Sequence, residues 1–427
     1  MPIRRLHASH PATVSGRRAQ VRPWVAALLL AGLLFPATSG AAVPQGPAGD
    51  EFYAPPQALV AGESGTMVWA RPASPITTIS AAASSTTVIY RSRNIYGDPS
   101  VVSGQVFLPK GDAPAGGWPV VAWSHVTTGA ADRCAPSRAT AGDPELDRML
   151  RGNAMAVSLL NAGVAVVRSD YEGLGTPGPH PYLIGASLAR STTDMVRAAH
   201  DLSPDLSRRW VAAGHSEGGV SSLFTGARAR ALAPEFDLRG VAAVAPALRS
   251  GLLLQTLRNL AAVPGDLATL PALASIVLTG AAVEDPELGR LFKQGALSDR
   301  ALALLPDTET RCLADLTYTD SWGGLAPKFF TGEDRALTKT ALARLDRVLN
   351  RNDARNLTFP RNLPVRLDQG VVDPVTLKIF ADEFVLTQWL KGKQVTYRSY
   401  PTATHANITD DRYAVRPLTA WILSRLS

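Results

Sequence analysis

The feature that most constrains the fold of this chain is the Gly-His-Ser-Glu-Gly-Gly segment at residues 214–219. It lies between a short apolar run, residues 210–213, which predicts a buried strand, and residues 220–229, which predict a helix. A serine between a strand and a helix, with glycines two residues before and after it, is typical of a nucleophile elbow. Small residues are needed there because the neighbouring backbone passes close enough to collide with a Cβ. We therefore predict that the Ser216 hydroxyl lies at a sharp turn, beside the positive end of a helix dipole.

Along most of the chain, short apolar runs alternate with segments of helical character. The runs predicted as strands are 86–92, 103–108, 119–123, 163–168, 240–245, 364–367 and 394–399. The segments predicted as helices are 144–160, 186–202, 376–391 and a last one that ends at Leu426. A turn at 96–99 should join the first two strands, and residues 43–80, rich in Pro, Gly and Ala, should wrap the surface. This order predicts an α/β protein whose mostly parallel sheet is flanked by helices.

Residues 247–350 interrupt the alternation. They are rich in Leu, Ala and Arg, have helical character and contain no run that predicts a strand. We therefore expect an α/β core in two parts, residues 43–246 and 351–427, with residues 247–350 inserted as a helical cap over the pocket. The alternative is an ordinary helical extension with no role at the site.

The first 42 residues predict a secretory signal peptide. Five arginines and no acidic residue precede the end of an apolar run at 24–35, and small residues follow through Ala42, so cleavage is expected near Ala41 or Ala42. The run is well short of the roughly 20 residues that span a bilayer, and no later segment is apolar for long enough. Arg17 and Arg18 weakly indicate twin-arginine export. The mature protein is therefore expected to be secreted or periplasmic.

The net charge of +7 largely reflects this leader. Without its five arginines the chain has 38 basic and 36 acidic residues, a net charge of +2, which does not indicate a nucleic-acid partner. The chain has no P-loop, no G-x-G-x-x-G after a strand and no His/Asp/Glu cluster with zinc spacing, so neither cofactor nor metal is expected. Its only cysteines, Cys134 and Cys312, predict one disulfide in an oxidising compartment.

Chain order selects the partners of the serine. A serine hydroxyl needs an adjacent base, and after a nucleophile elbow the acid and then the histidine follow in sequence. Of the seven histidines only His405 follows Ser216, and it lies in a loop after a predicted strand. Asp368 and Asp373 compete for the role of the acid. Asp368 continues a strand whereas Asp373 lies in the loop beyond it, so the loop position favours Asp373.

An oxyanion intermediate would need two N–H donors. One is expected from Glu217, directly after the nucleophile, and the other from Thr127, in the loop after the strand at 119–123. His125 lies in the same loop, where we expect it to brace the backbone rather than to take part in catalysis.

Together these features resemble the secretory lipases, the lipase A type within the α/β-hydrolase superfamily. The resemblance covers most of the chain after the leader, and it rests on segments 50–53, 127–129, 134–137, 170–175, 214–219, 369–373 and 404–406. It implies an α/β-hydrolase fold, hydrolysis of carboxylic esters and a triad of Ser216, Asp373 and His405. It also implies that Thr127 and Glu217 donate to the oxyanion.

The resemblance further implies that the helical cap carries Cys312. This sequence departs from the pattern of the family at two positions. Val126 stands where bacterial relatives usually have glycine, and Glu217 stands where glutamine is commoner. Neither change removes a backbone donor, but the first would narrow or stiffen the loop and the second puts a charge beside the nucleophile.

The sequence thus predicts a secreted serine esterase or lipase that acts through an acyl-enzyme on small-molecule or lipid esters. The cap is expected to make transient contact with a lipid interface. Two alternatives stay open: a serine peptidase of the same fold, since a triad does not distinguish amide from ester, and a non-catalytic binding protein that has kept the fold.

Overall fold

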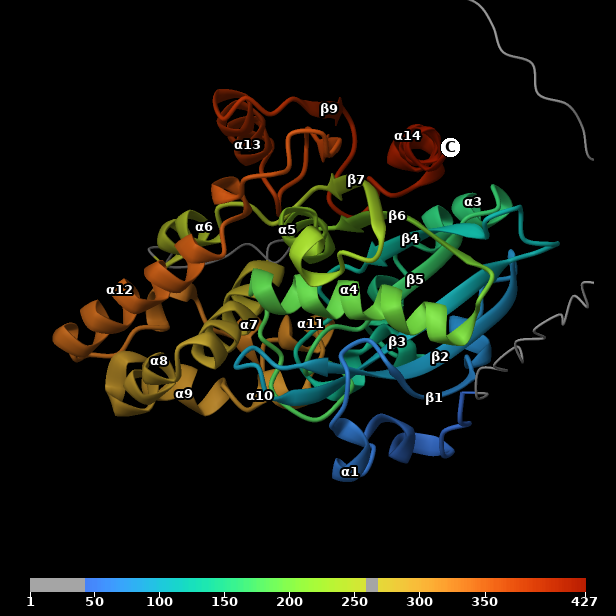
Figure 1. Ribbon diagram of the computed structural model, residues 1–427. Coiled ribbons are helices and arrows are strands. Elements are labelled where there is room, and N and C mark those ends of the chain that lie inside the picture. Colours follow the sequence, from blue (N-terminus) through green and yellow to red (C-terminus); the bar gives the residue numbers. More distant parts are fainter. Residues whose placement is uncertain (1–42, 259–267) are drawn as a thin grey trace, which may run out of the picture. The chain divides into compact units, whose positions relative to one another are not determined.

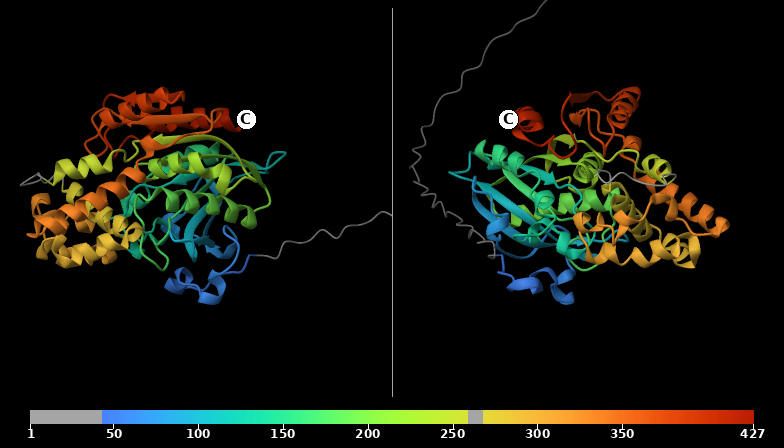
Figure 2. Two further views of the ribbon diagram at one scale, coloured as in Figure 1. Left: turned by 60° about the vertical axis from the view of Figure 1, so that its left-hand side comes forward. Right: turned by 180° about the vertical axis from the view of Figure 1, so that it is seen from behind.

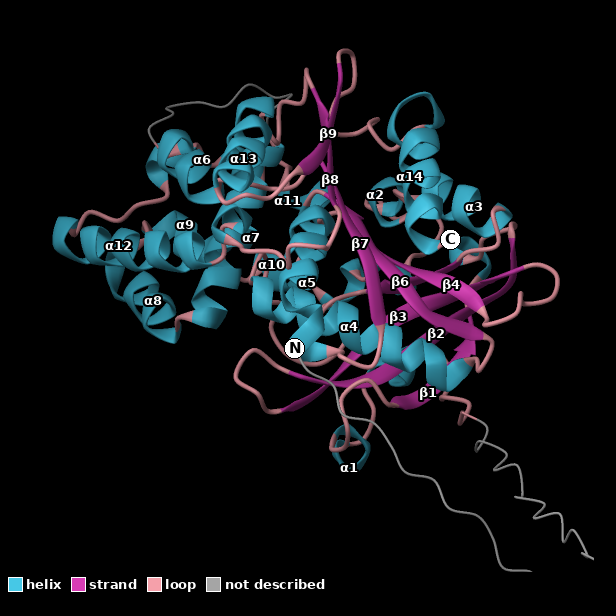
Figure 3. Ribbon diagram, turned by 45° about the horizontal axis from the view of Figure 1, so that its top comes forward, coloured by secondary structure: helices cyan, strands magenta, loops and turns pink. Residues whose placement is uncertain are grey.

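The computed structural model describes residues 43–258 and 268–427 of the chain. The predicted signal peptide, residues 1–42, and its cleavage site lie outside the described residues. One nine-stranded sheet, magenta in Figure 3, organises the rest, with the strand order β1-β2-β3-β5-β4-β6-β7-β8-β9. The strands are β1 (Met67–Pro72), β2 (Ala82–Arg93), β3 (Pro99–Pro109), β4 (Trp118–Ser124), β5 (Ala165–Ser169), β6 (Leu206–His215), β7 (Asp237–Val244), β8 (Val365–Gly370) and β9 (Val395–Tyr400).

The sheet is antiparallel at one end and parallel over the remainder. Strands β1, β2, β3 and β5 pair antiparallel in that order, and the predicted hairpin forms between β2 and β3. Strands β5, β4, β6, β7, β8 and β9 are all parallel to one another. The prediction of a mostly parallel sheet is therefore confirmed. Because parallel strands share a direction, the loops that follow β4, β6, β8 and β9 meet at one edge of the sheet.

Helices cover both faces of the sheet, as predicted. Helices α3 (Asn153–Asn161) and α14 (Arg416–Leu426) pack on one face, and α4 (Gly185–Leu202) and α5 (Glu217–Leu232) pack on the other (Figure 1). The alternation along β4 shows why the strand is apolar throughout. Val121 and Trp123 belong to the core beneath α3, whereas Val120 and Ala122 belong to the core beneath α4.

The segment between β7 and β8 forms a group of helices, and its described residues add no strand to the sheet. Helix α12 (Arg335–Arg351) packs against three others of the group, α6 (Ser250–Leu257), α7 (Thr269–Glu284) and α8 (Pro286–Leu291). The group also contains α9 (Asp299–Leu304), α10 (Asp307–Thr310) and α11 (Leu313–Leu316). In Figures 1 and 2 these yellow to orange helices lie together on one side of the blue and green strands. The segment is thus a helical insertion, although its bounds as a separate domain stay a prediction.

The prediction of one continuous helix over 144–160 is wrong, because the helix is interrupted between Met149 and Asn153. The chain instead forms a short helix, α2 (Leu146–Met149), then a turn, then α3. The break falls at Gly152, whose φ of +98° lies in the left-handed region, and a Cβ there would collide with the Trp123 indole. The apolar pattern continues across the turn, which is why the sequence suggested one helix.

The prediction for residues 43–80 is also incomplete. This segment does not only wrap the surface, because Met67–Pro72 form the edge strand β1. Phe52 and Tyr53 are buried against that strand, and the Trp69 indole N–H donates to the carbonyl oxygen of Phe52 at 2.9 Å. The apolar part of the strand is four residues long and lies among Pro and Gly residues that predict a loop.

Candidate active site

Ser216 lies at the junction predicted for a nucleophile elbow. Strand β6 ends at His215 and α5 begins at Glu217, and Ser216 between them has φ 60° and ψ −116°, a strained conformation for any residue other than glycine. A Cβ on Gly214 would collide with the carbonyl of Gly218. The turn can therefore be this tight only with glycine beside it, and it sets the serine at the carboxyl edge of the parallel strands.

The structure brings the three predicted triad residues into one chain of hydrogen bonds. The Ser216 hydroxyl donates to Nε2 of His405 at 2.9 Å, and Nδ1 of His405 donates to Oδ2 of Asp373 at 2.8 Å. Asp373 lies in the loop after β8 and His405 in the loop after β9. Groups suited to act as a nucleophile, as a base and as the group that orients the base are thus joined in series by direct hydrogen bonds.

The carboxylate of Asp373 is held by its own loop. Its Oδ1 accepts the backbone N–H groups of Val375 and Thr376, both at 2.8 Å, and its Oδ2 accepts the Thr376 hydroxyl at 2.8 Å. Burial alone would raise the pKa of Asp373, but the hydrogen bond and charge of His405 and the contacts with Thr376 outweigh it, so the pKa lies below its usual value. The ionised carboxylate favours the tautomer of His405 with hydrogen on Nδ1.

Thr376 is a site residue that the sequence analysis missed. Besides its bond to Asp373, its hydroxyl lies 3.2 Å from Nδ1 of His405. An aspartate that accepts the N–H groups two and three residues onward forms an Asx turn. The spacing Asp-x-x-Thr directly after a strand is the signal that could have pointed to it.

Asp368, the competing acid, has a different environment. It is fully buried in β8 and forms a bidentate ion pair with Arg366, at 2.7 and 2.8 Å. It also accepts the Tyr400 hydroxyl at 2.7 Å. These bonds occupy its oxygens within the sheet, so the geometry assigns Asp368 a structural role.

The loop after β4 lies against the N-terminus of α5. A Cβ on Gly218 would collide with the carbonyl oxygen of Ser124, so glycine at this position allows the close approach. Among the described residues, no backbone or side-chain acceptor receives the N–H of Thr127 or of Glu217. Both predicted donors are therefore free to bind an oxyanion, and the Thr127 side chain is fixed by a 2.8 Å hydrogen bond to the Tyr182 hydroxyl.

Segment 170–175 packs against the loop after β4 and hydrogen-bonds to it. The Tyr171 hydroxyl donates to the carbonyl of His125 at 2.8 Å, and the two rings stack with centroids 4.3 Å apart. Tyr171 has φ 74°, unusual for a bulky side chain. The neighbouring Asp170 carboxylate accepts the Ser103 hydroxyl at 2.6 Å and the Ser137 N–H at 3.1 Å. The buried His125 thus packs behind the loop, in the bracing position expected for it.

The side chain of Glu217 is turned away from the nucleophile into a buried pair with His180. Nε2 of His180 lies 3.3 Å from Oε1 of Glu217, and Nδ1 donates to the Glu172 carbonyl at 2.8 Å. Burial alone would lower the pKa of His180, but the hydrogen bond and charge of Glu217 outweigh it and raise the pKa. The charge next to the nucleophile is therefore compensated by a histidine 37 residues earlier, a pairing that the sequence alone does not reveal.

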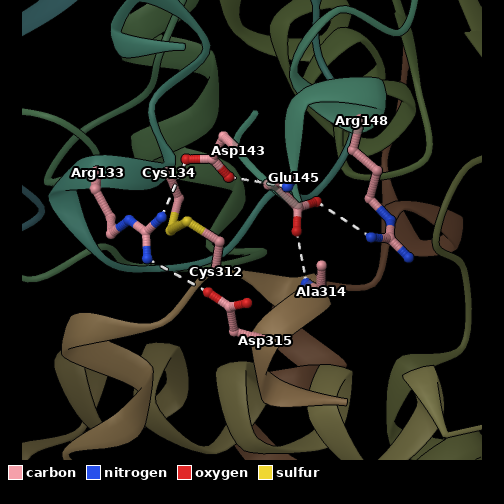
Figure 4. The surroundings of a disulfide bond; sticks show 8 residues. All are labelled: Arg133, Cys134, Asp143, Glu145, Arg148, Cys312, Ala314 and Asp315. Carbon is pink, nitrogen blue, oxygen red and sulfur yellow. Dashed lines mark hydrogen bonds and ion pairs between the residues drawn. A yellow bond between two sulfur atoms is a disulfide. The ribbon is translucent and has the colours of Figure 1, made fainter. Parts of the chain in front are cut away.

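Cys134 and Cys312 form the predicted disulfide, which ties the loop after β4 to the helical insertion (Figure 4). A backbone hydrogen bond from the Leu313 N–H to the Thr128 carbonyl, at 2.9 Å, lies beside it. The bridge joins residues 178 apart. The chain-entropy model gives such a loop about 5 kcal/mol of stabilisation, as an upper value.

Glu145 makes a further link between the core and the insertion. Its carboxylate accepts the N–H of Ala314 at 2.6 Å and a weaker bond from Arg148 at 3.4 Å (Figure 4). Burial raises the pKa of Glu145 from 4.5 to about 7, against the opposing effects of Arg148 and the Ala314 N–H. This carboxyl group is therefore partly protonated at neutral pH.

We expect Glu145 to make stability depend on pH. Its pKa is higher in the folded protein than in the unfolded chain, so the folded state binds more protons between pH 4.5 and about 7. The free energy of unfolding should therefore fall as pH rises through this window, by about 3 kcal/mol in all. Urea unfolding at pH 5 and pH 8 should show this loss in the wild type but not in Glu145→Gln, whose amide oxygen can still accept from Ala314. Asp147→Asn, at an exposed neighbouring position, is the control and should follow the wild type.

A pocket of about 320 Å³ opens at the candidate triad, with Ser216, His405 and Thr127 in its wall. Most of the remaining wall is apolar and comes from the helical insertion. Six aliphatic side chains of α6 and α7 line it: Leu253, Leu254, Leu257, Leu270, Leu273 and Val277. A mainly hydrophobic pocket with a few convergent polar groups is typical of a small-molecule binding site.

Neither a metal-ion site nor a membrane-spanning helix occurs in the part of the chain that the structure describes. No group of three His, Cys, Asp or Glu residues is placed to hold a metal ion across residues 43–258 and 268–427. Likewise, no helix in these two ranges is long and apolar enough to cross a membrane.

The mostly parallel sheet, the helices on both faces and the strand–serine–helix junction define the α/β-hydrolase fold. Within that class the chain belongs to the secretory lipase family, because residues 151–427 match the sequence pattern of that family.

Two solved structures are similar to this protein. Candida antarctica lipase A has a TM-score of 0.67 at 19% identity, covering 83% of this chain and 80% of its own. The rice cell wall degrading esterase LipA of Xanthomonas oryzae, in a ligand-bound form, has a TM-score of 0.66 at 20% identity, covering 86% and 100%. At these identities the likeness shows the fold alone.

A curated relative from Mycobacterium tuberculosis, a probable inactive lipase, is 28% identical over 285 residues. The match covers 64% of this chain and 59% of the relative's length. The family therefore supports a lipase or esterase type of hydrolase, but membership alone does not establish activity.

Proposed function

We propose that this protein is a secreted serine hydrolase of carboxylic esters. The observation that carries the proposal is the continuous hydrogen-bonded chain from Ser216 through His405 to Asp373. Membership of the secretory lipase family supports both the reaction class and secretion. The basic, apolar leader at residues 1–42 and the disulfide, which needs an oxidising compartment to persist, also support secretion.

In the proposed mechanism, His405 removes the Ser216 proton through Nε2 as Oγ attacks the ester carbonyl. Asp373 holds the imidazole in the required tautomer and stabilises the imidazolium that forms. The N–H groups of Thr127 and Glu217 bind the oxyanion. His405 then protonates the leaving alcohol, and water, activated by the same histidine, hydrolyses the acyl-enzyme.

The aliphatic wall contributed by α6 and α7 suits the hydrocarbon part of an ester. In this proposal the helical insertion acts as a cap, because its side chains line the pocket that contains Ser216. The lipid-interface contact expected of this cap stays a prediction. An esterase is favoured over a peptidase because the chain belongs to the secretory lipases and the aliphatic side chains of the wall suit a hydrocarbon group.

A non-catalytic binding protein is the second candidate, and the name of the mycobacterial relative makes it specific. We expect a fluorophosphonate to label this protein stoichiometrically, with the label on the peptide that contains Ser216. Labelling should require native folding and should be lost after denaturation, because the reactivity depends on His405. A folded, unlabelled protein would support the binding-protein candidate. Faster cleavage of a peptide amide than of esters by the labelled enzyme would favour the peptidase.

A further inference from the structure

The pocket wall contains two arginines, Arg148 and Arg151, in addition to its aliphatic side chains. None of the described residues that line the pocket is an aspartate or a glutamate. The described part of the wall therefore carries two positive charges and no carboxylate. A site for a purely hydrocarbon ester has no use for guanidinium groups, since each would have to be kept solvated beside the chain.

The two arginines differ in their partners. Arg148 donates to Glu145 at 3.4 Å, although Glu145 is only partly ionised at neutral pH because burial raises its pKa to about 7. Arg151 is half-buried, and none of the described residues forms a hydrogen bond or ion pair with its side chain. Burial and the like charge of Arg148 lower the pKa of Arg151, against weaker opposing effects of nearby carboxylates. A guanidinium nevertheless stays protonated in proteins.

Two buried arginines of this protein, Arg168 and Arg366, show the partners that a structural guanidinium has. Arg168 donates to the Asn153 side chain at 2.7 Å and to the Gly152 carbonyl at 3.0 Å. Arg366 has its bidentate pair with Asp368. None of the described residues accepts from the Arg151 side chain in this way, so its donors are available to a molecule in the pocket.

Arg151 is also electrostatically close to the candidate base. After burial, the charges of His405 and then Arg151 contribute most to lowering the pKa of His215. The rings of His215 and His405 lie with centroids 4.9 Å apart. The unpartnered guanidinium thus belongs to the wall near the reacting groups.

We propose that Arg151, with Arg148 beside it, forms an anion subsite, and that the esters hydrolysed here carry a carboxylate. A guanidinium and a carboxylate form paired, charge-assisted hydrogen bonds, which would satisfy Arg151 when substrate is bound. The aliphatic wall of α6 and α7 takes the hydrocarbon part of the same molecule. This inference rests on the proposed esterase function, and it adds the substrate class.

Two pairs of aryl esters test the subsite, and their hydrolysis is followed by the absorbance of the released phenol. 4-Nitrophenyl pentanoate and 4-nitrophenyl hydrogen glutarate differ by a carboxylate on the acyl side, and phenyl acetate and 4-acetoxybenzoate differ by one on the alcohol side. Arg151→Gln should lower kcat/KM for at least one anionic ester about tenfold or more, mainly through KM, and change its neutral partner less than about twofold. Arg151→Lys should restore part of the loss. Arg300→Gln, exposed on α9 and absent from the pocket wall, is the matched control and should change neither.

A loss limited to the glutarate ester places the subsite on the acyl side, and a loss limited to 4-acetoxybenzoate places it on the alcohol side. Equal losses on neutral and anionic esters, or an unchanged ratio between them, would overturn the subsite while leaving the esterase in place. If the wild type hydrolyses none of the four, the esterase proposal fails instead. Calorimetric binding of free glutarate and benzoate to the wild type and to Arg151→Gln then still decides the subsite, because equal binding to both proteins rules it out.

Discussion

We expect the Ser216→Ala variant to lose about 10⁶-fold in ester turnover, the scale for removal of the nucleophile from a preorganised triad. The hydroxyl is the only group of Ser216 that takes part in the hydrogen bond to His405. Alanine keeps the Cβ, so it meets the same backbone conformation at φ 60° as serine does. The variant should therefore fold, and initial rates on a chromogenic ester, with circular dichroism and melting temperature, would measure both effects.

The matched control is Ser222→Ala, in the same helix. The Ser222 hydroxyl donates to the carbonyls of Gly219 and Ala242, both at 2.9 Å, and it does not line the pocket. Its loss should affect stability by about 1 kcal/mol and leave turnover nearly unchanged. A folded Ser216→Ala protein with near wild-type turnover would contradict the whole serine-hydrolase proposal.

The strands that hold the site were predictable because a parallel sheet is buried on both faces. Each of its strands therefore appears as a short continuous apolar run. The run at 119–123 falls within β4, and the run at 240–245 overlaps β7 up to its end at Val244. The break at Gly152 was not predictable in the same way. The Trp123 indole leaves no room for a Cβ at this position, and it is close in space but 29 positions away in the sequence.

The candidate triad was accessible from sequence for a different reason. Chain order and the small number of histidines leave one choice for the base, and the end of β8 separates the two candidate acids. Long-range pairing carries no such signal. His180 meets Glu217 because distant segments pack together. The same packing leaves the Arg151 side chain without a hydrogen-bond partner among the described residues, so neither role could be inferred from local pattern.

The same long-range packing connects the helical insertion to the candidate active site. The Leu313 N–H donates to the carbonyl of Thr128, directly after the predicted oxyanion donor Thr127, and the disulfide and the Glu145–Ala314 bond tie the insertion to the chain that follows this loop. Backbone donors stabilise an oxyanion only when they are held in place before the reaction. The insertion therefore supports the position of the donor loop as well as lining the pocket.

The second large effect is expected for Asp373→Asn, which should lower turnover about 10⁴-fold without unfolding the protein. The two backbone N–H groups of Val375 and Thr376 that now bind Oδ1 require an oxygen there. The asparagine oxygen will take that place, which turns its NH₂ group toward Nδ1 of His405. Nδ1 must then accept rather than donate, so Nε2 carries the hydrogen and cannot receive the proton of Ser216.

Asp368→Asn is the control that separates the effect on the His405 tautomer from the loss of a negative charge near the site. Asp368 lies in β8, directly before the loop that contains Asp373, but its partners are Arg366 and the Tyr400 hydroxyl. The change leaves a buried guanidinium unpaired, so unfolding in urea should show a destabilisation of about 3–5 kcal/mol. Turnover per folded molecule should stay near the wild-type value. The opposite result would be that Asp368→Asn abolishes turnover and Asp373→Asn only destabilises the protein. Asp368 would then be the triad acid, because only the acid that sets the histidine tautomer can reduce the rate while the fold remains intact.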